Sequence, residues 1–398
     1  MSITSRYLLD LHYDPHVTPE ELFREHAAFG EQYPPPPRPI RPPGEKIRVA
    51  YVSGDFRYHA CACFLLPLIE RHDRARFDVF CYGNLKVNAD AVTDRFRELS
   101  HWRPITGLTD EQVIEQITAD KIDVLVDCSG HTSGKRVSLF ARRPAMVSVT
   151  FLGYPDTTGL RQIDYRLTDA VADPVHEGNT LATEELVRMP RGIHSYRPIY
   201  PTPPPAEPPC LKNGYITFCS FNNRLKTNDE TLKVWTQVLN AVPNSRLVLK
   251  NPRWTGRPFL AGAFDRVTVL SNAEDHHPHF AAYGLADIAL DTFPYSGTTT
   301  TCDAFWMGLP VVALRGRHHV GRTSASFLTQ VGLTDLIAEN VDQYVEIATR
   351  LAADRQRLVD LRANLRSLVQ ASPLGQADVV VRDLEDFYVR AIDRALGT

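Results

Sequence analysis

The chain has 398 residues and a formal net charge of −3 at pH 7, with 44 basic and 47 acidic side chains. This balance gives no reason to expect a nucleic-acid partner, and a hydrophobic content of 43% is enough for real cores. No run approaches the roughly 18 apolar residues of a membrane span, and the N-terminus lacks the apolar core of a cleavable signal. With seven scattered cysteines typical of buried thiols, the sequence predicts a cytoplasmic protein of about two domains.

The first 43 residues predict an arm and a connector. Residues 1–32 have a helical pattern, with Thr18 as the N-cap before Pro-Glu-Glu. Residues 33–43, YPPPPRPIRPP, predict an extended, semi-rigid linker. We expect the arm to pack against the rest of the chain and to take no part in chemistry.

From residue 44 onward, strands and helices alternate. Strands are expected at 47–53, 77–82, 122–127 and 147–152, and helices at 64–70 and 110–119. After a second proline-rich stretch, 190–209, the alternation resumes with strands at 216–220, 246–249, 267–270, 288–290 and 311–314. Helices are expected there at 229–242, near 280–283, at 303–307 and from 324 to the C-terminus, including 344–352, 358–369 and 377–395.

This alternation predicts an α/β fold of two Rossmann-like lobes facing across a cleft, each with a parallel sheet covered by helices. The expected divisions are the arm and linker 1–43, an N-terminal lobe 44–195, a linker 196–211, a C-terminal lobe 212–372 and a final helix 373–398. Ligands in such sheets bind at the carboxyl ends of the strands.

Four threonines, Thr298–Thr301, stand between a strand and a helix of the second lobe. Their hydroxyls and the unpaired N–H groups of a helix start suit a phosphate, because the helix dipole is positive there. Asp303, one turn on, could take a ribose hydroxyl. An ordinary N-cap is the alternative, but the acidic residue favours a nucleotide site.

Lys226 ends the segment SFNNRLK, which follows a strand and precedes a helix. A cation at that position would neutralise a departing diphosphate. A solvent-facing loop lysine is the alternative, and the threonine-rich helix start in the same lobe favours the phosphate interpretation.

The histidines leave alternatives open. His59, in SGDFRYH after the first strand, could act as an acid/base, bind a substrate by hydrogen bonding, or be structural, and His131 in SGHTSG has the same status. Residues 276–279, HHPH, cannot easily surround one metal ion. A histidine there could stack on a ligand's base or simply be exposed.

Several well-known nucleotide motifs are missing. No GxGxxG follows a strand, and there is no GKS/GKT, no GxSxG elbow and no DxD that would hold a metal on a nucleotide sugar. Any diphosphate must therefore be neutralised by protein groups, so we expect neither a metal ion nor a cofactor.

Seven stretches in both lobes carry a family resemblance: RVAYVSGDFRYH, LVDCSGHTSG, ARRPAMVSVTFLGYPDTTG, DYRLTDAVADP, ITFCSFNNRLK, LDTFPYSGTTTTCDAFWMGLPVV and GRTSASFL. From about Tyr7 onward the chain resembles the catalytic region of the O-linked N-acetylglucosamine transferase/SPINDLY family, inverting glycosyltransferases of GT-B fold. The resemblance implies metal-independent transfer of a sugar to a protein or peptide Ser/Thr hydroxyl, with UDP-GlcNAc as the favoured donor.

The resemblance also implies roles for residues. On the nucleotide-sugar side it places Lys226 on the diphosphate, Asn223 at a nucleotide contact, Thr299 and Thr300 on the phosphates, Asp303 on the ribose and His279 on the base, with Thr298 where animal members have a histidine. Lys226 and His59 are the candidate catalytic residues, His59 being the nearest base by analogy. His59, His131, Tyr154 and Asp156 are expected on the acceptor and sugar side.

Two departures from the family matter. Asp156 replaces a usual glycine in GYPDTTG, which bears on the choice of sugar or acceptor. About one helix's worth of sequence, near residues 5–30, stands where the family has a tetratricopeptide array, so a separate subunit could present the acceptor.

The alternatives are a GDP-fucose donor, as in the SPINDLY branch, a GT-B nucleotide-sugar epimerase or hydrolase, and a non-catalytic binding module. The retained Lys226, Thr299, Thr300 and Asp303 argue against the last.

Overall fold

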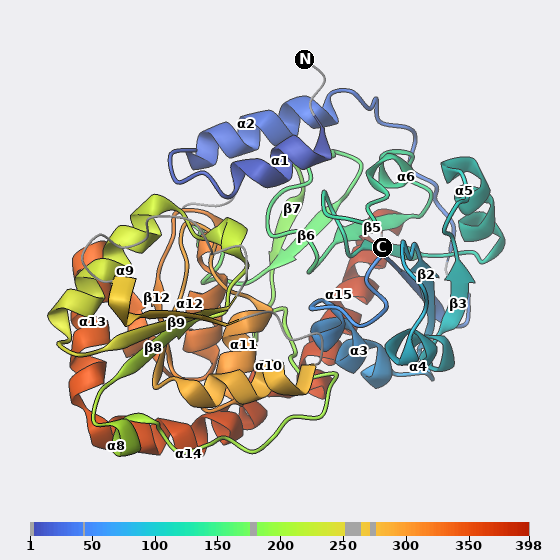
Figure 1. The fold of residues 1–398 in the computed structure, drawn as a ribbon. Helices are drawn as coiled ribbons and strands as arrows, with labels where there is room; N and C mark the ends of the chain where they lie inside the picture. Colours follow the sequence, from blue (N-terminus) through green and yellow to red (C-terminus); the bar gives the residue numbers. More distant parts are fainter. Residues whose placement is uncertain (1–3, 43, 176–180, 251–263, 271–275, 398) are drawn as a thin grey trace. The chain divides into compact units, whose positions relative to one another are not determined.

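The computed structural model describes the chain except residues 1–3, 43, 176–180, 251–263, 271–275 and 398. The chain forms two compact units (Figure 1). Unit 1 comprises Met1–Leu11, Val17–Ile199 and Gln376–Thr398, and unit 2 comprises His12–His16 and Tyr200–Gly375. The passage between them at Ile199 and Tyr200 falls within the proline-rich stretch 190–209.

Unit 1 is built on a seven-stranded parallel sheet with strand order β3-β2-β1-β4-β5-β6-β7. Its strands are β1 Ile47–Ser53, β2 Phe77–Gly83, β3 His101–Pro104, β4 Val124–Asp127, β5 Val147–Thr150, β6 Tyr165–Thr168 and β7 Glu185–Arg188. Sequence patterning did not predict β3, β6 and β7, because four residues each give little periodicity and the edge strands β3 and β7 are partly exposed. The sheet grows outward in both directions from β1 and β4, so the loops after these two strands lie at a topological switch point.

Two hydrophobic cores cover the faces of this sheet. Val49 and Tyr51 of β1 enter one core, whereas Ala50 and Val52 enter the other, as the two-residue period of a strand requires. Helices contributing to the first core are α3 Ala62–Arg71, α4 Ala91–Leu99 and α15 Ala377–Leu396. Helices contributing to the second core are α1 Ser5–Leu11, α2 Pro19–Gly30, α5 Asp110–Ala119 and α6 Val137–Ala141.

The helical stretch predicted over residues 1–32 is wrong in being continuous, since α1 and α2 are separate helices. Pro15 lies between them, and its missing N–H and its ring disfavour a continuous helix. The predicted start of α2 is confirmed. Thr18 Oγ1 accepts from the Glu21 N–H (3.2 Å), and Glu21 Oε2 accepts from the Thr18 N–H (3.0 Å).

The C-terminal helix α15 belongs to unit 1, where buried polar contacts fix it. Glu385 Oε1 accepts from His72 Nδ1 at 2.9 Å, and the other nitrogen of that ring lies 2.8 Å from the Tyr51 hydroxyl. The Tyr51 and Tyr388 hydroxyls are 3.2 Å apart. Satisfied polar groups of this kind fix the position of the helix more narrowly than its apolar face alone would.

Unit 2 contains a six-stranded parallel sheet with strand order β10-β9-β8-β11-β12-β13. Its strands are β8 Thr217–Ser220, β9 Arg246–Lys250, β10 Val267–Leu270, β11 Ile288–Leu290, β12 Val311–Leu314 and β13 Ile337–Ala338. Its helices are α8 Cys210–Asn213, α9 Asp229–Ala241, α10 His276–Ala282, α11 Thr299–Trp306, α12 Thr323–Gln330, α13 Val341–Ala353 and α14 Arg355–Ala371. The switch point of this sheet lies between β8 and β11.

In the parts of the chain described above, no helix is long and apolar enough to cross a membrane.

Candidate functional site

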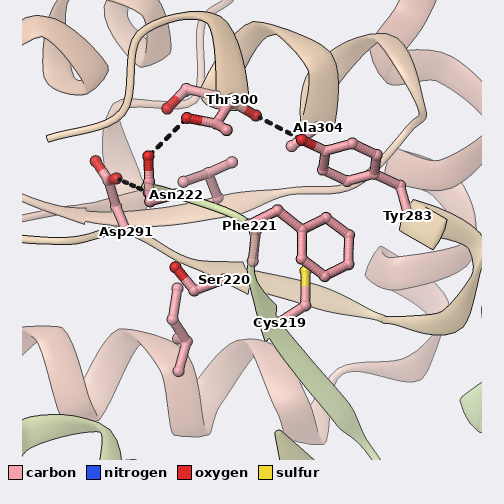
Figure 2. Close-up of a pocket in the computed structure, with 12 residues that line it drawn as sticks. Cys219, Ser220, Phe221, Asn222, Tyr283, Asp291, Thr300 and Ala304 are labelled. Atoms are coloured by element: carbon pink, nitrogen blue, oxygen red, sulfur yellow. Dashed lines mark hydrogen bonds between the residues drawn. The ribbon is translucent and has the colours of Figure 1, made fainter. Parts of the chain in front are cut away.

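Side-chain hydrogen bonds join the two loops at the switch point of unit 2. Asn222, just after β8, donates from Nδ2 to Asp291 Oδ1 (3.0 Å) at the end of β11. Its Oδ1 accepts from Thr300 Oγ1 (2.6 Å) in the first turn of α11, and Figure 2 shows Asn222 between these two partners. The loop after β8 is thereby fixed against the start of α11.

Helix α11 begins at Thr299 with Thr298 as its N-cap residue, four residues before the predicted helical run at 303–307. β-Branched threonines are weak helix formers, which hid the first turn from sequence patterning. A Cβ on Gly297 would lie 2.3 Å from Thr301 Oγ1, so the tight approach to the helix requires glycine. The first N–H groups of a helix have no carbonyl partner within it, which makes this end suitable for an anion.

Lys226 ends the 3₁₀ turn η1 (Arg224–Lys226) and lies beside the loop that leads into α11. Its half-buried ammonium donates to the Ser296 carbonyl at 2.8 Å and lies 4.0 Å from the centre of the Tyr295 ring. Burial lowers the pKa of Lys226 to about 8, while the Asp291 carboxylate acts in the opposite direction. The loops therefore hold a cation in a site that only partly compensates its charge.

Asn223 and Asn222 have different local roles. Asn223 is exposed, and its Oδ1 accepts from the Leu225 N–H at 3.1 Å, which caps the turn that carries Lys226. Asn222 bridges the two loops, and sequence reasoning did not single it out although it lies in the same motif.

A chain of three side chains connects β9, α10 and α11. His279 Nε2 lies 3.0 Å from Asp303 Oδ2, and its Nδ1 lies 2.7 Å from Lys250 Nζ. Because an ammonium can only donate, Nδ1 is the acceptor and Nε2 carries the proton given to the carboxylate. Burial lowers the pKa of Lys250, while Asp303 opposes this. The contacts thus select one tautomer and one orientation of the ring.

Sequence reasoning missed Lys250, although a signal existed: it is the last residue of a strand adjacent to β8. The side chains of residues 276–278 in the HHPH segment lie outside the described residues.

The small cavity beside these loops is too small for a substrate. It measures about 20 Å³, room for one water-sized molecule, and is lined by residues including Ser220, Asn222 and Asp291 (Figure 2).

In unit 1, His59 lies in the loop after β1, with 34% of its side chain exposed. Its Nδ1 accepts from the Cys61 N–H at 3.2 Å and lies 3.5 Å from Asp55 Oδ2. Burial lowers the pKa of His59, partly offset by Asp55. With Nδ1 accepting, the neutral ring carries its proton on Nε2, which suits hydrogen-bond donation to a substrate.

His131 and Tyr154 are buried and engaged within unit 1. His131 Nδ1 lies 2.9 Å from Ser5 Oγ, and its Nε2 lies 2.8 Å from the Thr158 carbonyl. The Tyr154 hydroxyl lies 2.6 Å from His26 Nε2. These contacts favour the structural alternative for His131 and give Tyr154 a role in holding α2, which carries His26.

Asp156 is half-buried and lies near the same cluster, in the segment GYPDTTG. Its Oδ1 accepts from the Thr157 N–H at 2.7 Å. Burial opposes the positive charge of Arg166. The carboxylates of Asp173 and Asp156 act in the other direction and raise the pKa of the Arg166 guanidinium. The Asp156 carboxylate, which replaces the glycine usual in the family, therefore helps to balance the buried positive charge of Arg166 inside unit 1.

The structure thus groups the predicted residues by unit. In unit 2, Lys226 and Thr298–Thr300 are brought together at one switch point, and His279 contacts Asp303. In unit 1, His131 and Tyr154 contact each other as rings 5.0 Å apart, and His59 lies on another loop.

Comparison with known proteins agrees with this arrangement. The model of the family "Glycosyl transferase family 41" matches residues 31–195 and 209–384. The chain is 38% identical to a protein named probable UDP-N-acetylglucosamine--peptide N-acetylglucosaminyltransferase SPINDLY from Solanum lycopersicum, over 96% of this chain and 43% of that protein. Another, named SEC, from Arabidopsis thaliana is 28% identical over 87% and 37%. The chain therefore spans less than half the length of these relatives.

Solved structures give the same result. An O-GlcNAc transferase mutant of Thermobaculum terrenum superposes with a TM-score of 0.90 at 36% identity, over 98% of this chain and 77% of that one. A sucrose-phosphate synthase from Thermosynechococcus elongatus, 11% identical with a TM-score of 0.52 over 87% of this chain and 99% of that one, shares the fold alone. The predicted GT-B fold class is confirmed, and the chain belongs to glycosyl transferase family 41, the family of the O-GlcNAc transferase and SPINDLY proteins.

Proposed function

We propose that this chain is a metal-independent, inverting glycosyltransferase that moves GlcNAc from UDP-GlcNAc to a Ser or Thr hydroxyl of a protein. The observation that carries the proposal is the position of the Lys226 ammonium beside the loop that opens α11. Relatives bearing the name UDP-N-acetylglucosamine--peptide N-acetylglucosaminyltransferase support the donor and acceptor classes.

The proposed chemistry is dominated by the leaving group. When the acceptor hydroxyl attacks the anomeric carbon, the sugar–oxygen bond breaks and negative charge grows on the diphosphate. We propose that Lys226 and the N–H groups of the first turn of α11 stabilise that charge, and the contact of Lys226 with the loop before α11 supports this. Two protein groups then do what a metal ion on a DxD motif does elsewhere, and the proposal needs no cofactor.

The proposal assigns the nucleoside to the Lys250, His279 and Asp303 chain. A ring held in one tautomer and orientation provides a flat, pre-ordered surface for a base, and the Asp303 carboxylate can accept from ribose hydroxyls. Asn223, exposed at the turn before Lys226, is proposed as a further nucleotide contact.

The acceptor side is proposed for unit 1, with His59 as the residue nearest to the acceptor by analogy. The hydrogen bond to its Nδ1 favours donation to a substrate over removal of a proton, and we propose the first role. Acceptor proteins are proposed partners, and a separate subunit that presents them remains part of the proposal.

GDP-fucose is the second candidate donor. The SPINDLY relatives are the more similar branch, 38% identical for the tomato protein against 28% for SEC. The positioned histidine and carboxylate accept a ribonucleoside with either base, so the two donors require a direct comparison.

The experiment is a transfer assay with the full chain, a Ser/Thr peptide library and either UDP-GlcNAc or GDP-fucose, with and without EDTA. We expect glycosylated peptide with UDP-GlcNAc, unaffected by EDTA. Lys226→Ala should lower turnover by roughly 10²–10³-fold, the typical loss on removing one donor that stabilises developing charge. Lys233→Ala, at an exposed lysine of the same unit, is the matched control.

Three outcomes would contradict the proposal: near-normal transfer by Lys226→Ala, activity restored only by a divalent cation, or release of free sugar or an epimer without peptide. The last would favour the hydrolase or epimerase alternative. Glycopeptide formed only with GDP-fucose would correct the donor and leave the transfer chemistry in place.

A further inference from the structure

The loop after β1 brings together three side chains of different chemistry that face one another. Asp55 is buried, and His59 and Cys61 are half-buried. One ligand atom from each, a carboxylate oxygen, an imidazole nitrogen and the thiol sulfur, lies within 4.8 Å of the other two. The Cys-Ala-Cys segment that supplies the sulfur has no role in the proposed transfer reaction.

We propose that Asp55, His59 and Cys61 form a binding site for a thiophilic divalent cation, with zinc as the best fit.

The separations allow a zinc site after small side-chain rotations. Zn–S bonds of about 2.3 Å and Zn–N or Zn–O bonds of about 2.0–2.2 Å put tetrahedral ligand atoms roughly 3.3–3.7 Å apart. The observed limit of 4.8 Å is about one ångström wider than this, and His59 Nδ1 is already 3.5 Å from Asp55 Oδ2. Three protein ligands leave a fourth position for water, as in open zinc sites.

The chemistry of the ligands selects the class of ion. A thiolate and an imidazole suit zinc and cobalt, whereas magnesium and calcium require a shell of oxygens. Arg57 Nη2 lies 3.7 Å from Asp55 Oδ1, so the cation should bind the other carboxylate oxygen, Oδ2, on the His59 side.

The S–H of Cys61 donates to the Asp55 carboxylate, and sulfur binds a metal as the thiolate, so this proton must leave. A divalent cation would replace that proton, which passes to solvent, while Nδ1 would exchange the Cys61 N–H for the metal. Binding should therefore weaken as the pH falls.

The decisive test is a titration of the full chain with Co²⁺, which reports sulfur ligation directly. We expect one Co²⁺ per chain, visible bands of a four-coordinate ion and a near-ultraviolet thiolate-to-cobalt charge-transfer band. Cys61→Ala should abolish the charge-transfer band, whereas Cys63→Ala, at a buried cysteine two residues on, should keep it. His59→Ala should weaken binding by at least about 10–100-fold, since even outer-shell partners contribute that much.

No charge-transfer band in the wild-type protein, a band retained in Cys61→Ala, or a band lost only in Cys63→Ala would overturn the site. Circular dichroism of each variant verifies that the fold is intact.

Discussion

The pKa of Lys226 allows a sharp test of its role, because the charge that holds a diphosphate should disappear within an accessible pH range. Burial lowers this pKa to about 8 in the free protein. The ammonium is therefore present below pH 8 and is lost as the pH rises through 8, and only the charged form attracts the anion. Binding of UDP should weaken with rising pH, and the diphosphate should raise the pKa of Lys226 in the complex.

The magnitude follows from this linkage. If only the ammonium supports tight binding, the Kd of UDP scales with one plus the ratio of neutral to charged Lys226, so it should rise about tenfold between pH 7 and pH 9. The rise should level off once the contact is lost, because a hydrogen bond to a charged group contributes about 1.5–3 kcal/mol, roughly 10–150-fold in Kd.

Isothermal titration calorimetry measures both the affinity and the proton uptake. In buffers of different ionisation enthalpy, the observed heat gives the protons taken up per UDP bound. With the contact limited to roughly 10–150-fold, these should be about 0.1 at pH 7, about 0.4–0.5 at pH 8 and about 0.5–0.9 at pH 9 for a group of pKa about 8.

Lys226→Arg is the control, since a guanidinium does not lose its proton in this range. We expect its affinity to be weaker at pH 7, because a planar fork does not replace a compact ammonium, and to lack the tenfold loss that Lys226 causes between pH 7 and pH 9. Titration of the nucleotide itself and of Lys250 affects both proteins equally and cancels in the comparison. Equal pH profiles for the wild type and Lys226→Arg, or no proton uptake at pH 8, would refute the assignment of Lys226 to the diphosphate.

Two further predictions test the surroundings of the site. Lys250→Met removes the donor to His279 Nδ1 and should raise the Kd of UDP about tenfold, the contribution of a charge-assisted hydrogen bond. Lys233→Met, at an exposed position, should leave the Kd unchanged. Equal Kd values for the two variants in calorimetry would contradict the positioning role of Lys250. Gly30→Ala would put a Cβ 1.7 Å from the Gly159 carbonyl oxygen. This clash should lower the free energy of unfolding by about 1–3 kcal/mol and the Tm by several degrees in calorimetric melting. Gly44→Ala, whose Cβ would have its nearest contact 3.9 Å away, should leave the Tm unchanged.

Sequence patterning predicted strands that are apolar runs between turn residues or helices, and it missed β6, whose segment YRLT contains an arginine. The strands at 267–270, 288–290 and 311–314 were predicted with the bounds that the structure has, because each is a short apolar run bounded by turn residues or helices. The assignment of the C-terminal helix to unit 1 could not be predicted. It depends on contacts such as His72 with Glu385, 313 residues apart in the chain, which no local pattern encodes.

For the candidate site, sequence reasoning predicted residue types at strand ends but not their partners. It selected Lys226 and Asp303 because each stands near a strand end or helix start, whereas His279 was selected by the family resemblance. It missed Asn222 and Lys250, whose importance comes from a hydrogen bond to a distant segment. Asn223 attracted attention in the motif, whereas the structure shows its neighbour making the bridge between loops.

The electrostatics of unit 2 explain why a lysine with a lowered pKa suits the proposed reaction. Burial disfavours the Lys226 charge, and the nearby Asp291 carboxylate compensates it only in part, so a further negative charge is needed to stabilise it fully. An intact nucleotide sugar provides some of that charge, and the departing diphosphate provides more. The interaction therefore strengthens as the sugar–oxygen bond breaks, which is the condition for a contact to raise turnover as well as affinity. A fully exposed lysine, already stabilised by water, would gain less from the same change. This difference predicts that moving Lys226 into solvent would weaken catalysis more than it weakens the binding of UDP-GlcNAc.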